Sequence, residues 1–128
     1  MSANPIRVVC IEDEPDMIDL VRLILAPQGF EVVGASNGAE GLRLVESLRP
    51  ALVLLDLMMP NMDGWEVYQR MKANDEMNKI PVIVITAKAQ SIDKMLGLRI
   101  AKVDDYITKP FGPTQLIKSI EKVLAKNS

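Results

Sequence analysis

The chain has 128 residues, a formal net charge of -2 and 48% hydrophobic residues, values that are typical of one soluble globular domain. It contains no histidine and a single cysteine, Cys10, which excludes histidine-dependent triads, histidine-ligated zinc and a disulfide within the chain. Any bound metal is therefore expected to be a hard cation with oxygen ligands. The charge balance does not predict direct binding of nucleic acid, and the lack of a long apolar segment predicts a cytoplasmic protein without a membrane span.

Five short apolar segments alternate with segments of helical periodicity. The central apolar segments are continuous, which is typical of strands covered on both faces. Single helices between strands imply right-handed crossovers and a parallel sheet. We therefore expect an α/β domain with a three-layer (βα)5 architecture over residues 1–128, with a core at about 6–126. The expected strands are Ile6–Ile11, Phe30–Ala35, Leu52–Leu55, Val82–Ile85 and Asp105–Ile107.

The helical segments carry apolar stripes together with start and stop signals. Pro27 and Gly29 indicate the end of the first helix, and Pro50 indicates the end of the second. Asn37, with Glu40 three residues later, predicts a helix N-cap with its capping-box partner. The stripes are Met17, Leu20, Val21, Ile24 and Leu25, then Leu42, Val45 and Leu48, then Trp65, Tyr68 and Met71, then Ile92, Met95 and Leu96, and finally Leu116, Ile120, Val123 and Leu124.

Polar and charged residues lie at the carboxyl ends of the expected strands. Asp56 ends a buried apolar segment, where an unpaired charge costs on the order of several kcal/mol. Because the carboxyl ends of parallel strands meet at one edge of a sheet, ligands bind there. The residues at this edge are Glu12, Asp13 and Glu14 after the first strand, Asp56 after the third, Thr86 after the fourth and Lys109 after the fifth.

Each of these residues taken alone also has an ordinary structural explanation. Glu12 and Asp13 equally fit residues that cap the next helix, and threonine such as Thr86 is common in strands. Lys109 alone fits a solvated surface lysine, and Asp56 fits a buried carboxylate that accepts hydrogen bonds from the backbone. Their joint placement at successive strand ends favours one shared site.

The residue types in this set favour phosphoryl chemistry on a carboxylate. Crowded carboxylates raise one another's pKa, and a divalent cation with oxygen ligands relieves their repulsion. Asp56 can then remain ionised and act as a nucleophile that forms an aspartyl-phosphate. Lys109 would neutralise charge on the phosphoryl oxygens, and the hydroxyl of Thr86 would donate a hydrogen bond to one of them.

From about Arg7 to Leu124 the chain resembles the receiver domain of bacterial two-component response regulators, and it is similar to chemotaxis-type single-domain receivers. The resemblance implies a flavodoxin-like fold with strand order 2-1-3-4-5. It also implies a phosphorylation-dependent signalling switch rather than an enzyme with its own substrate. The motifs that carry it are Val-Cys-Ile-Glu-Asp-Glu, Leu-Leu-Asp-Leu-Met-Met-Pro-Asn-Met-Asp-Gly, Val-Ile-Thr-Ala and Asp-Asp-Tyr-Ile-Thr-Lys-Pro-Phe.

By this resemblance, Asp56 receives a phosphoryl group from a histidine kinase or a phosphotransfer protein. The resemblance implies a Mg²⁺ site, in which Mn²⁺ can substitute, and an Mg²⁺-dependent part for the domain in its own phosphotransfer and dephosphorylation. The implied metal ligands are Glu12, Asp13, Asp56 and the backbone carbonyl of Met58.

The resemblance also assigns roles at the last two strands. Thr86 and Lys109 would contact the phosphoryl group, and the Lys109–Pro110 peptide bond would be cis. Thr86 and Tyr106 would form a switch pair that moves on phosphorylation, although Tyr106 also fits an ordinary half-buried strand aromatic. The implied output surface is formed by the fourth helix, the fifth strand and the fifth helix, and its partner is an unidentified output protein or domain.

Several residues depart from the usual family pattern or invite a hypothesis. Lys102 and Val103 stand where the family usually has glycine and alanine, which predicts an altered or marginal end of the fourth helix, and Lys102→Gly is then expected to raise the melting temperature slightly. The last helix, 113–126, lacks the arginine pattern of the DNA-binding subgroup, so dimerisation through the output surface is a hypothesis only. Met58 and Lys88 are predicted to tune the lifetime of the phosphorylated state.

Three other classes of protein are alternatives to this interpretation. Phosphohydrolases that form an aspartyl-phosphate usually carry a second aspartate two residues after the nucleophile, where this chain has Met58. A flavin-binding domain needs a glycine- or hydroxyl-rich loop after the first strand, where this chain has Glu12-Asp13-Glu14. The third alternative is a degenerate receiver that only binds a partner, although the acidic cluster, Thr86 and Lys109 are all present.

Overall fold

The computed structural model describes residues 5–59, 64–86 and 103–127, which contain a five-stranded parallel sheet in the order β2-β1-β3-β4-β5. This confirms the predicted α/β fold and the strand order. Three strands end one residue later than predicted, so that Asp56 and Thr86 occupy the last positions of β3 and β4. The strands are β1 (Ile6–Ile11), β2 (Phe30–Ala35), β3 (Leu52–Asp56), β4 (Val82–Thr86) and β5 (Asp105–Thr108).

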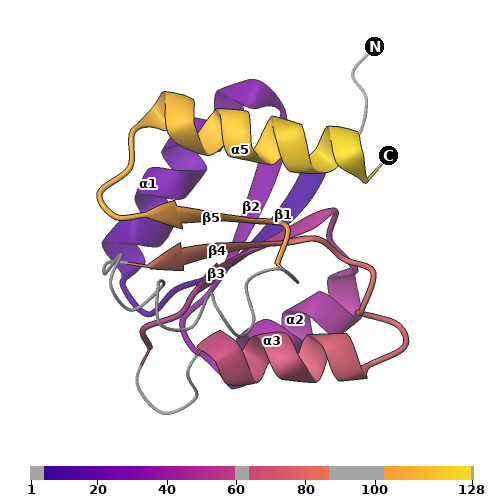
Figure 1. Ribbon diagram of the computed structural model, residues 1–128. Coiled ribbons are helices and arrows are strands. Elements are labelled where there is room, and N and C mark those ends of the chain that lie inside the picture. The colour runs from indigo at the N-terminus through magenta and orange to yellow at the C-terminus, as the bar shows by residue number, and fades with distance from the viewer. Residues whose placement is uncertain (1–4, 60–63, 87–102, 128) are drawn as a thin grey trace.

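Helices cover both faces of the sheet, as Figure 1 shows. The helices α1 (Pro15–Leu25) and α5 (Pro113–Lys126) pack on one face, and α2 (Gly38–Leu48) and α3 (Gly64–Ala73) pack on the other. A short 3-10 helix, η1 (Ala26–Gln28), follows α1. The predicted fourth stripe, Ile92 to Leu96, lies outside the described residues. None of the described helices is long and apolar enough to cross a membrane.

The two faces of the sheet form two separate hydrophobic cores, because side chains alternate between the faces along each strand. In β3, Leu54 faces α1 and α5, whereas Leu55 faces α2 and α3. The strands β3 and β4 are buried along their whole length, as their continuous apolar sequences predict. This double coverage leaves the carboxyl edge of the sheet as the place where polar side chains gather.

The predicted helix signals at the first two helices are seen in the structure. Gly29 ends the first helical segment with a left-handed φ of 88°, a conformation that glycine adopts without steric cost. At the start of α2, the side chain of Asn37 accepts a hydrogen bond from the backbone of Glu40. The carboxylate of Glu40 accepts from the backbone of Ser36 rather than from Asn37, so the capping box is shifted by one residue.

The register of the strands places the polar residues at the ends of β3, β4 and β5 side by side at the carboxyl edge of the sheet. Asp56 pairs with Ile85, which places it beside the penultimate residue of β4. Thr86 pairs with Thr108, so that Lys109 emerges from β5 next to the end of β4. The sheet itself therefore positions three of the predicted site residues.

Candidate functional site

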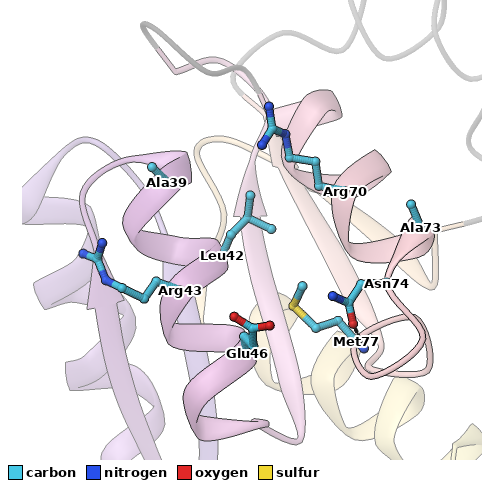
Figure 2. Close-up of a pocket in the computed structure, with 8 residues that line it drawn as sticks. All are labelled: Ala39, Leu42, Arg43, Glu46, Arg70, Ala73, Asn74 and Met77. Carbon is cyan, nitrogen blue, oxygen red and sulfur yellow. Dashed lines mark hydrogen bonds between the residues drawn. The ribbon is translucent and has the colours of Figure 1, made fainter.

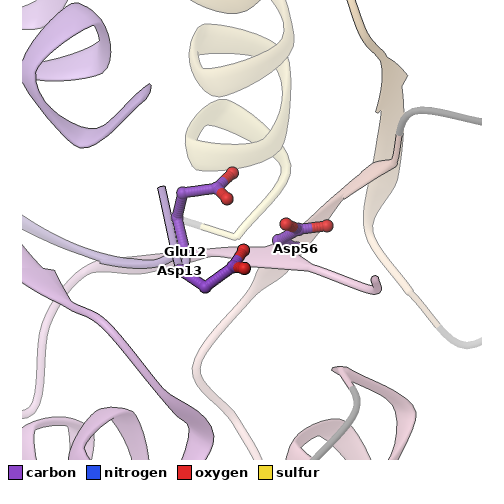
Figure 3. A group of neighbouring side chains, drawn as sticks. All are labelled: Glu12, Asp13 and Asp56. Atoms are coloured by element: carbon purple, nitrogen blue, oxygen red, sulfur yellow. The ribbon is translucent and has the colours of Figure 1, made fainter. Parts of the chain in front are cut away.

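Three carboxylates converge at the carboxyl edge of the sheet (Figure 3). Glu12 and Asp13 follow β1, and Asp56 ends β3; one ligand oxygen from each lies within 4.8 Å of the others. Glu12 and Asp56 are only 1% and 3% exposed, respectively. The predicted convergence of these residues is present, and it is a geometry that suits an oxygen-ligated divalent cation.

Lys109 lies against this cluster and contacts three carboxylates. Its Nζ atom lies 2.8 Å from Oε1 of Glu12, and 3.5 Å from both Oδ2 of Asp56 and Oε1 of Glu14. The backbone N–H of Lys109 donates to the carbonyl of Thr86 at 2.8 Å, which fixes the lysine to the end of β4. Lys109 is therefore a partly buried partner of the cluster and not a solvated surface lysine.

The electrostatics of the cluster follow from burial and crowding. The pKa of Glu12 is raised to about 7, mainly because burial disfavours its charged form. The hydrogen bond from Lys109 lowers this pKa, and the proximity of Asp56 raises it. Burial alone would lower the pKa of Lys109, but the hydrogen bond to Glu12 and the charge of Asp56 outweigh it and raise that pKa. A cluster that discourages ionisation of Glu12 is one that a divalent cation would stabilise.

Asp56 has a local hydrogen-bond donor that the sequence did not reveal. The backbone N–H of Met58 donates to its Oδ1 atom at 2.9 Å. A turn two residues later can present a backbone donor to a carboxylate, and residue types alone do not show such a donor. The side chain of Met58 is 47% exposed at this edge of the sheet.

Gly64 is a site residue that the sequence reasoning did not single out. A Cβ atom at this position would meet the backbone carbonyl oxygen of Asp56 and would lie 2.6 Å from Cα of Leu57. The backbone N–H of Gly64 also donates to the carbonyl of Leu57 at 3.2 Å. Glycine thus lets the start of α3 pack directly against the backbone at Asp56, and the Asp-Gly pair that ends the second motif was the available signal.

The remaining predicted residues lie in different surroundings. Thr86 is fully buried at the end of β4, whereas Tyr106, opposite Val84 in the β4–β5 register, is 44% exposed. The Lys109–Pro110 bond is cis, as the resemblance implies. The predictions on Lys88 and Lys102 concern residues outside the part of the chain that the structure describes. Tyr106 lines a surface hollow of about 250 Å³ with Asp105, Ile107, Gln115, Lys118, Ser119 and Lys122.

A larger hollow, of about 560 Å³, lies between α2 and α3 (Figure 2). Leu42 and Met77 give it an apolar floor, and Glu46 adds a carboxylate. None of the three clustered carboxylates lines it. The acidic site is therefore distinct from this hollow, whose residues are Ala39, Leu42, Arg43, Glu46, Arg70, Ala73, Asn74 and Met77.

Comparison with known proteins shows the family of this chain. A sequence model of the response regulator receiver domain matches residues 8–121. The DNA-binding response regulator MtrA of Mycolicibacterium smegmatis is 35% identical over 94% of this chain. The signal receiver domain of a signal transduction histidine kinase from Syntrophus aciditrophicus is 29% identical, has a TM-score of 0.84, and covers 94% of this chain and 90% of its own.

One of the similar solved structures contains a bound magnesium ion. The receiver domain of sensor histidine kinase PA1611 from Pseudomonas aeruginosa PAO1, crystallised with magnesium in its active site cleft, has a TM-score of 0.84. Its sequence is 22% identical to this chain, and the alignment covers 94% of this chain and 98% of the PA1611 chain. At this identity the likeness establishes the fold alone. The chain spans about half the length of the curated relatives it matches.

Proposed function

We propose, on the premise that this chain belongs to the response regulator receiver domain family, that Asp56 accepts a phosphoryl group from a histidine kinase or a phosphotransfer protein. The family relationship makes the chain a signalling domain whose state depends on phosphorylation. The observation that supports Asp56 is its place among Glu12, Asp13 and Lys109 at the edge of the sheet. We place the domain core at residues 6–126.

The residues around Asp56 fit a bound Mg²⁺ ion, with Mn²⁺ as a substitute. Glu12, Asp13 and Asp56 each supply one carboxylate oxygen, and these oxygens lie within 4.8 Å of one another. The backbone carbonyl of Met58 is proposed as a fourth ligand. The raised pKa of Glu12 reflects burial and crowding that a divalent cation would relieve. When bound, the cation would neutralise charge on the phosphoryl oxygens and on the carboxylates.

The chemical step is a transfer to one carboxylate oxygen. An Oδ atom of Asp56 forms the new O–P bond while the P–N bond to the histidine of the donor breaks, and the electron pair of that bond returns to the imidazole. The ammonium of Lys109, whose Nζ atom lies 3.5 Å from Oδ2 of Asp56 in the resting site, would stabilise charge on the phosphoryl group. The hydroxyl of Thr86 is proposed to donate to a phosphoryl oxygen.

The phosphorylated state is proposed to change the output surface. A phosphoryl group adds roughly two negative charges and three acceptor atoms, which would draw Thr86 toward it and give the ring of Tyr106 space to move inward. The affected surface includes β5 and α5, with the fourth helix as the third proposed part. Its proposed partners are an output protein or domain, or a second copy of the chain.

The domain is also proposed to take part in its own dephosphorylation, in which water attacks the phosphorus and releases phosphate. Met58 has an exposed side chain and donates its backbone N–H to Asp56, and it is proposed, with Lys88, to control the access of water. We place the chain in the cytoplasm, where the catalytic domain of a histidine kinase works.

The direct test is intact mass spectrometry after incubation with Mg²⁺ and acetyl phosphate. Wild type is expected to gain one phosphoryl adduct, which chelation of the metal abolishes. Asp56→Asn should give no adduct, whereas Asp75→Asn, an exposed aspartate remote from the cluster in sequence, should be phosphorylated like wild type. An adduct that survives in Asp56→Asn would overturn the assignment of the acceptor.

The same samples separate the alternative functions. A phosphohydrolase would turn over phosphate esters catalytically, which we do not expect because Met58 stands where a general acid would be needed. A degenerate receiver would give neither an adduct nor calorimetrically detectable binding of Mg²⁺. Both results together would replace the proposed switch by a binding module.

A further inference from the structure

We propose that Glu14 determines phosphodonor specificity by placing one uncompensated negative charge at the mouth of the site; this rests on the proposed function of Asp56. The Oε1 atom of Glu14 lies 3.5 Å from Nζ of Lys109, and the side chain of Glu14 is 66% exposed. Lys109 itself is only 12% exposed. Glu14 is thus the solvent-facing partner of the lysine that is expected to meet the phosphoryl group.

The local charge balance explains why Glu14 matters. The three clustered carboxylates are formally balanced by one divalent cation together with the ammonium of Lys109. Among the described residues that contact the lysine, Glu14 then leaves one net negative charge, and its side chain is the most exposed to solvent of the three carboxylates that contact Lys109. A small anionic donor meets this charge before it reaches Asp56, so its approach is disfavoured.

A protein donor experiences the same charge differently. A folded partner can present a cationic or hydrogen-bonding group to Glu14 when it docks, which converts repulsion into a favourable contact. Glu14 therefore selects against free, highly charged phosphodonors without selecting against a docked protein. Glu14 thus influences which donor reaches Asp56, and it does so without contacting the reacting atoms.

Substitution at Glu14 is structurally undemanding, which makes the proposal testable. Glu14 is the N-cap of α1, but its side chain makes no capping hydrogen bond. The contact it makes to the cluster through the backbone, from its N–H to Oε2 of Glu12 at 3.2 Å, is retained in any side-chain variant. Glu14→Gln therefore removes the charge and preserves the size, and Glu14→Asp retains the charge.

The experiment compares phosphorylation rates, measured by intact mass, for the acetyl phosphate dianion and for phosphoramidate, whose net negative charge is smaller at neutral pH. Glu14→Gln is expected to react roughly three- to ten-fold faster with acetyl phosphate at low ionic strength. The gain should shrink toward unity as salt screens the charge, and it should be smaller with phosphoramidate. Glu14→Asp should behave like wild type.

Asp16→Asn is the matched control, because Asp16 is an exposed carboxylate in the first turn of the same helix. Its effect on the rate should be smaller than that of Glu14→Gln. A second readout is independent of phosphotransfer: calorimetry should find Mg²⁺ binding a few-fold weaker in Glu14→Gln at low salt, because one attractive charge is lost.

The outcomes are distinct. If wild type forms no adduct with either donor, the proposed function fails before Glu14 is tested. If wild type is phosphorylated but Glu14→Gln reacts at the same rate, or gains equally at all salt concentrations and with both donors, the specificity role of Glu14 is overturned.

Discussion

The Nζ atom of Lys109 lies 2.8 Å from Oε1 of Glu12, a residue 97 positions earlier in the chain, and closer than its 3.5 Å distance to Asp56. In the resting site the lysine therefore compensates Glu12 first. A phosphoryl group on Asp56 would compete for the same ammonium. The pairing of Lys109 thus links the charge state of Glu12 to the occupancy of Asp56.

The raised pKa of Glu12 predicts a pH-dependent stability in the absence of divalent cations. The ordinary pKa is 4.5 and the folded value is about 7, so the folded state holds the proton more tightly and loses stability as pH rises between these values. Relative to wild type, Glu12→Gln should gain roughly 1–3 kcal/mol of unfolding free energy between pH 4.5 and 7.5. Urea unfolding in the presence of a chelator measures this difference.

Glu46→Gln supplies the control for the Glu12 experiment, because Glu46 is an exposed glutamate on α2. Its unfolding free energy should follow that of wild type across the same pH range. If the curve for Glu12→Gln also runs parallel to wild type, then Glu12 does not hold a proton in the folded state at pH 6.

Gly64→Ala should damage both stability and phosphorylation. A Cβ atom at this position must displace the backbone at Asp56 and Leu57, and such overpacking costs roughly 1–3 kcal/mol. The phosphorylation rate should fall because the carboxylate of Asp56 moves with its backbone. Gly112→Ala is the control, since a Cβ there meets no atom within 4 Å, and as an N-cap substitution it should cost about 1 kcal/mol at most without changing the rate.

Ser119 should stabilise the packing of α5 on β5 through Asp105. Its hydroxyl donates to Oδ2 of Asp105 at 2.6 Å, and Lys122 lies 3.1 Å from the same oxygen. Burial favours the neutral form of Asp105, but these two interactions outweigh it and hold its pKa below the ordinary value. Ser119→Ala is expected to lower the free energy of unfolding by roughly 1–2 kcal/mol at pH 7.

The destabilisation by Ser119→Ala should diminish as pH falls. A carboxylate with a lowered folded pKa contributes stability above its unfolded pKa of 3.8, and this contribution is lost as the pH falls through the folded value. Thermal unfolding at pH 7 and near pH 3 tests this. Ser47→Ala, an exposed serine on α2, is the matched control, and an equal loss at both pH values would contradict the role of ionised Asp105.

Cys10 should be unreactive in the folded protein. It is 1% exposed in β1, and burial, together with the nearby charge of Glu12, raises the pKa of its thiol to about 12. Ellman's reagent is therefore expected to label it only at the rate of unfolding, and labelling should become rapid in denaturant. Fast, stoichiometric labelling under native conditions would show that β1 opens locally.

The sequence alone predicted the fold and the residues that lie together at the carboxyl edge of the sheet. Continuous apolar segments such as Leu52–Leu55 predicted strands covered on both faces, and their alternation with helical stripes predicted a parallel sheet. The topology then required that residues after each strand, including Glu12, Asp56 and Lys109, meet at one edge. These inferences succeeded because strand periodicity and crossover handedness are local or general properties of the chain.

Only the tertiary structure decided which partners these residues have. The preference of Lys109 for Glu12 over Asp56, the backbone donor at Met58 and the close approach of Gly64 depend on atomic positions that residues distant in sequence impose on one another. The solvent-facing contact of Glu14 with the same lysine is also of this kind. The energy of a steric contact changes over a few tenths of an ångström, and that of an electrostatic interaction over a few ångströms. Sequence patterns specify only which elements form and which faces are buried. The distances that decide these energies are therefore set only when the chain has folded.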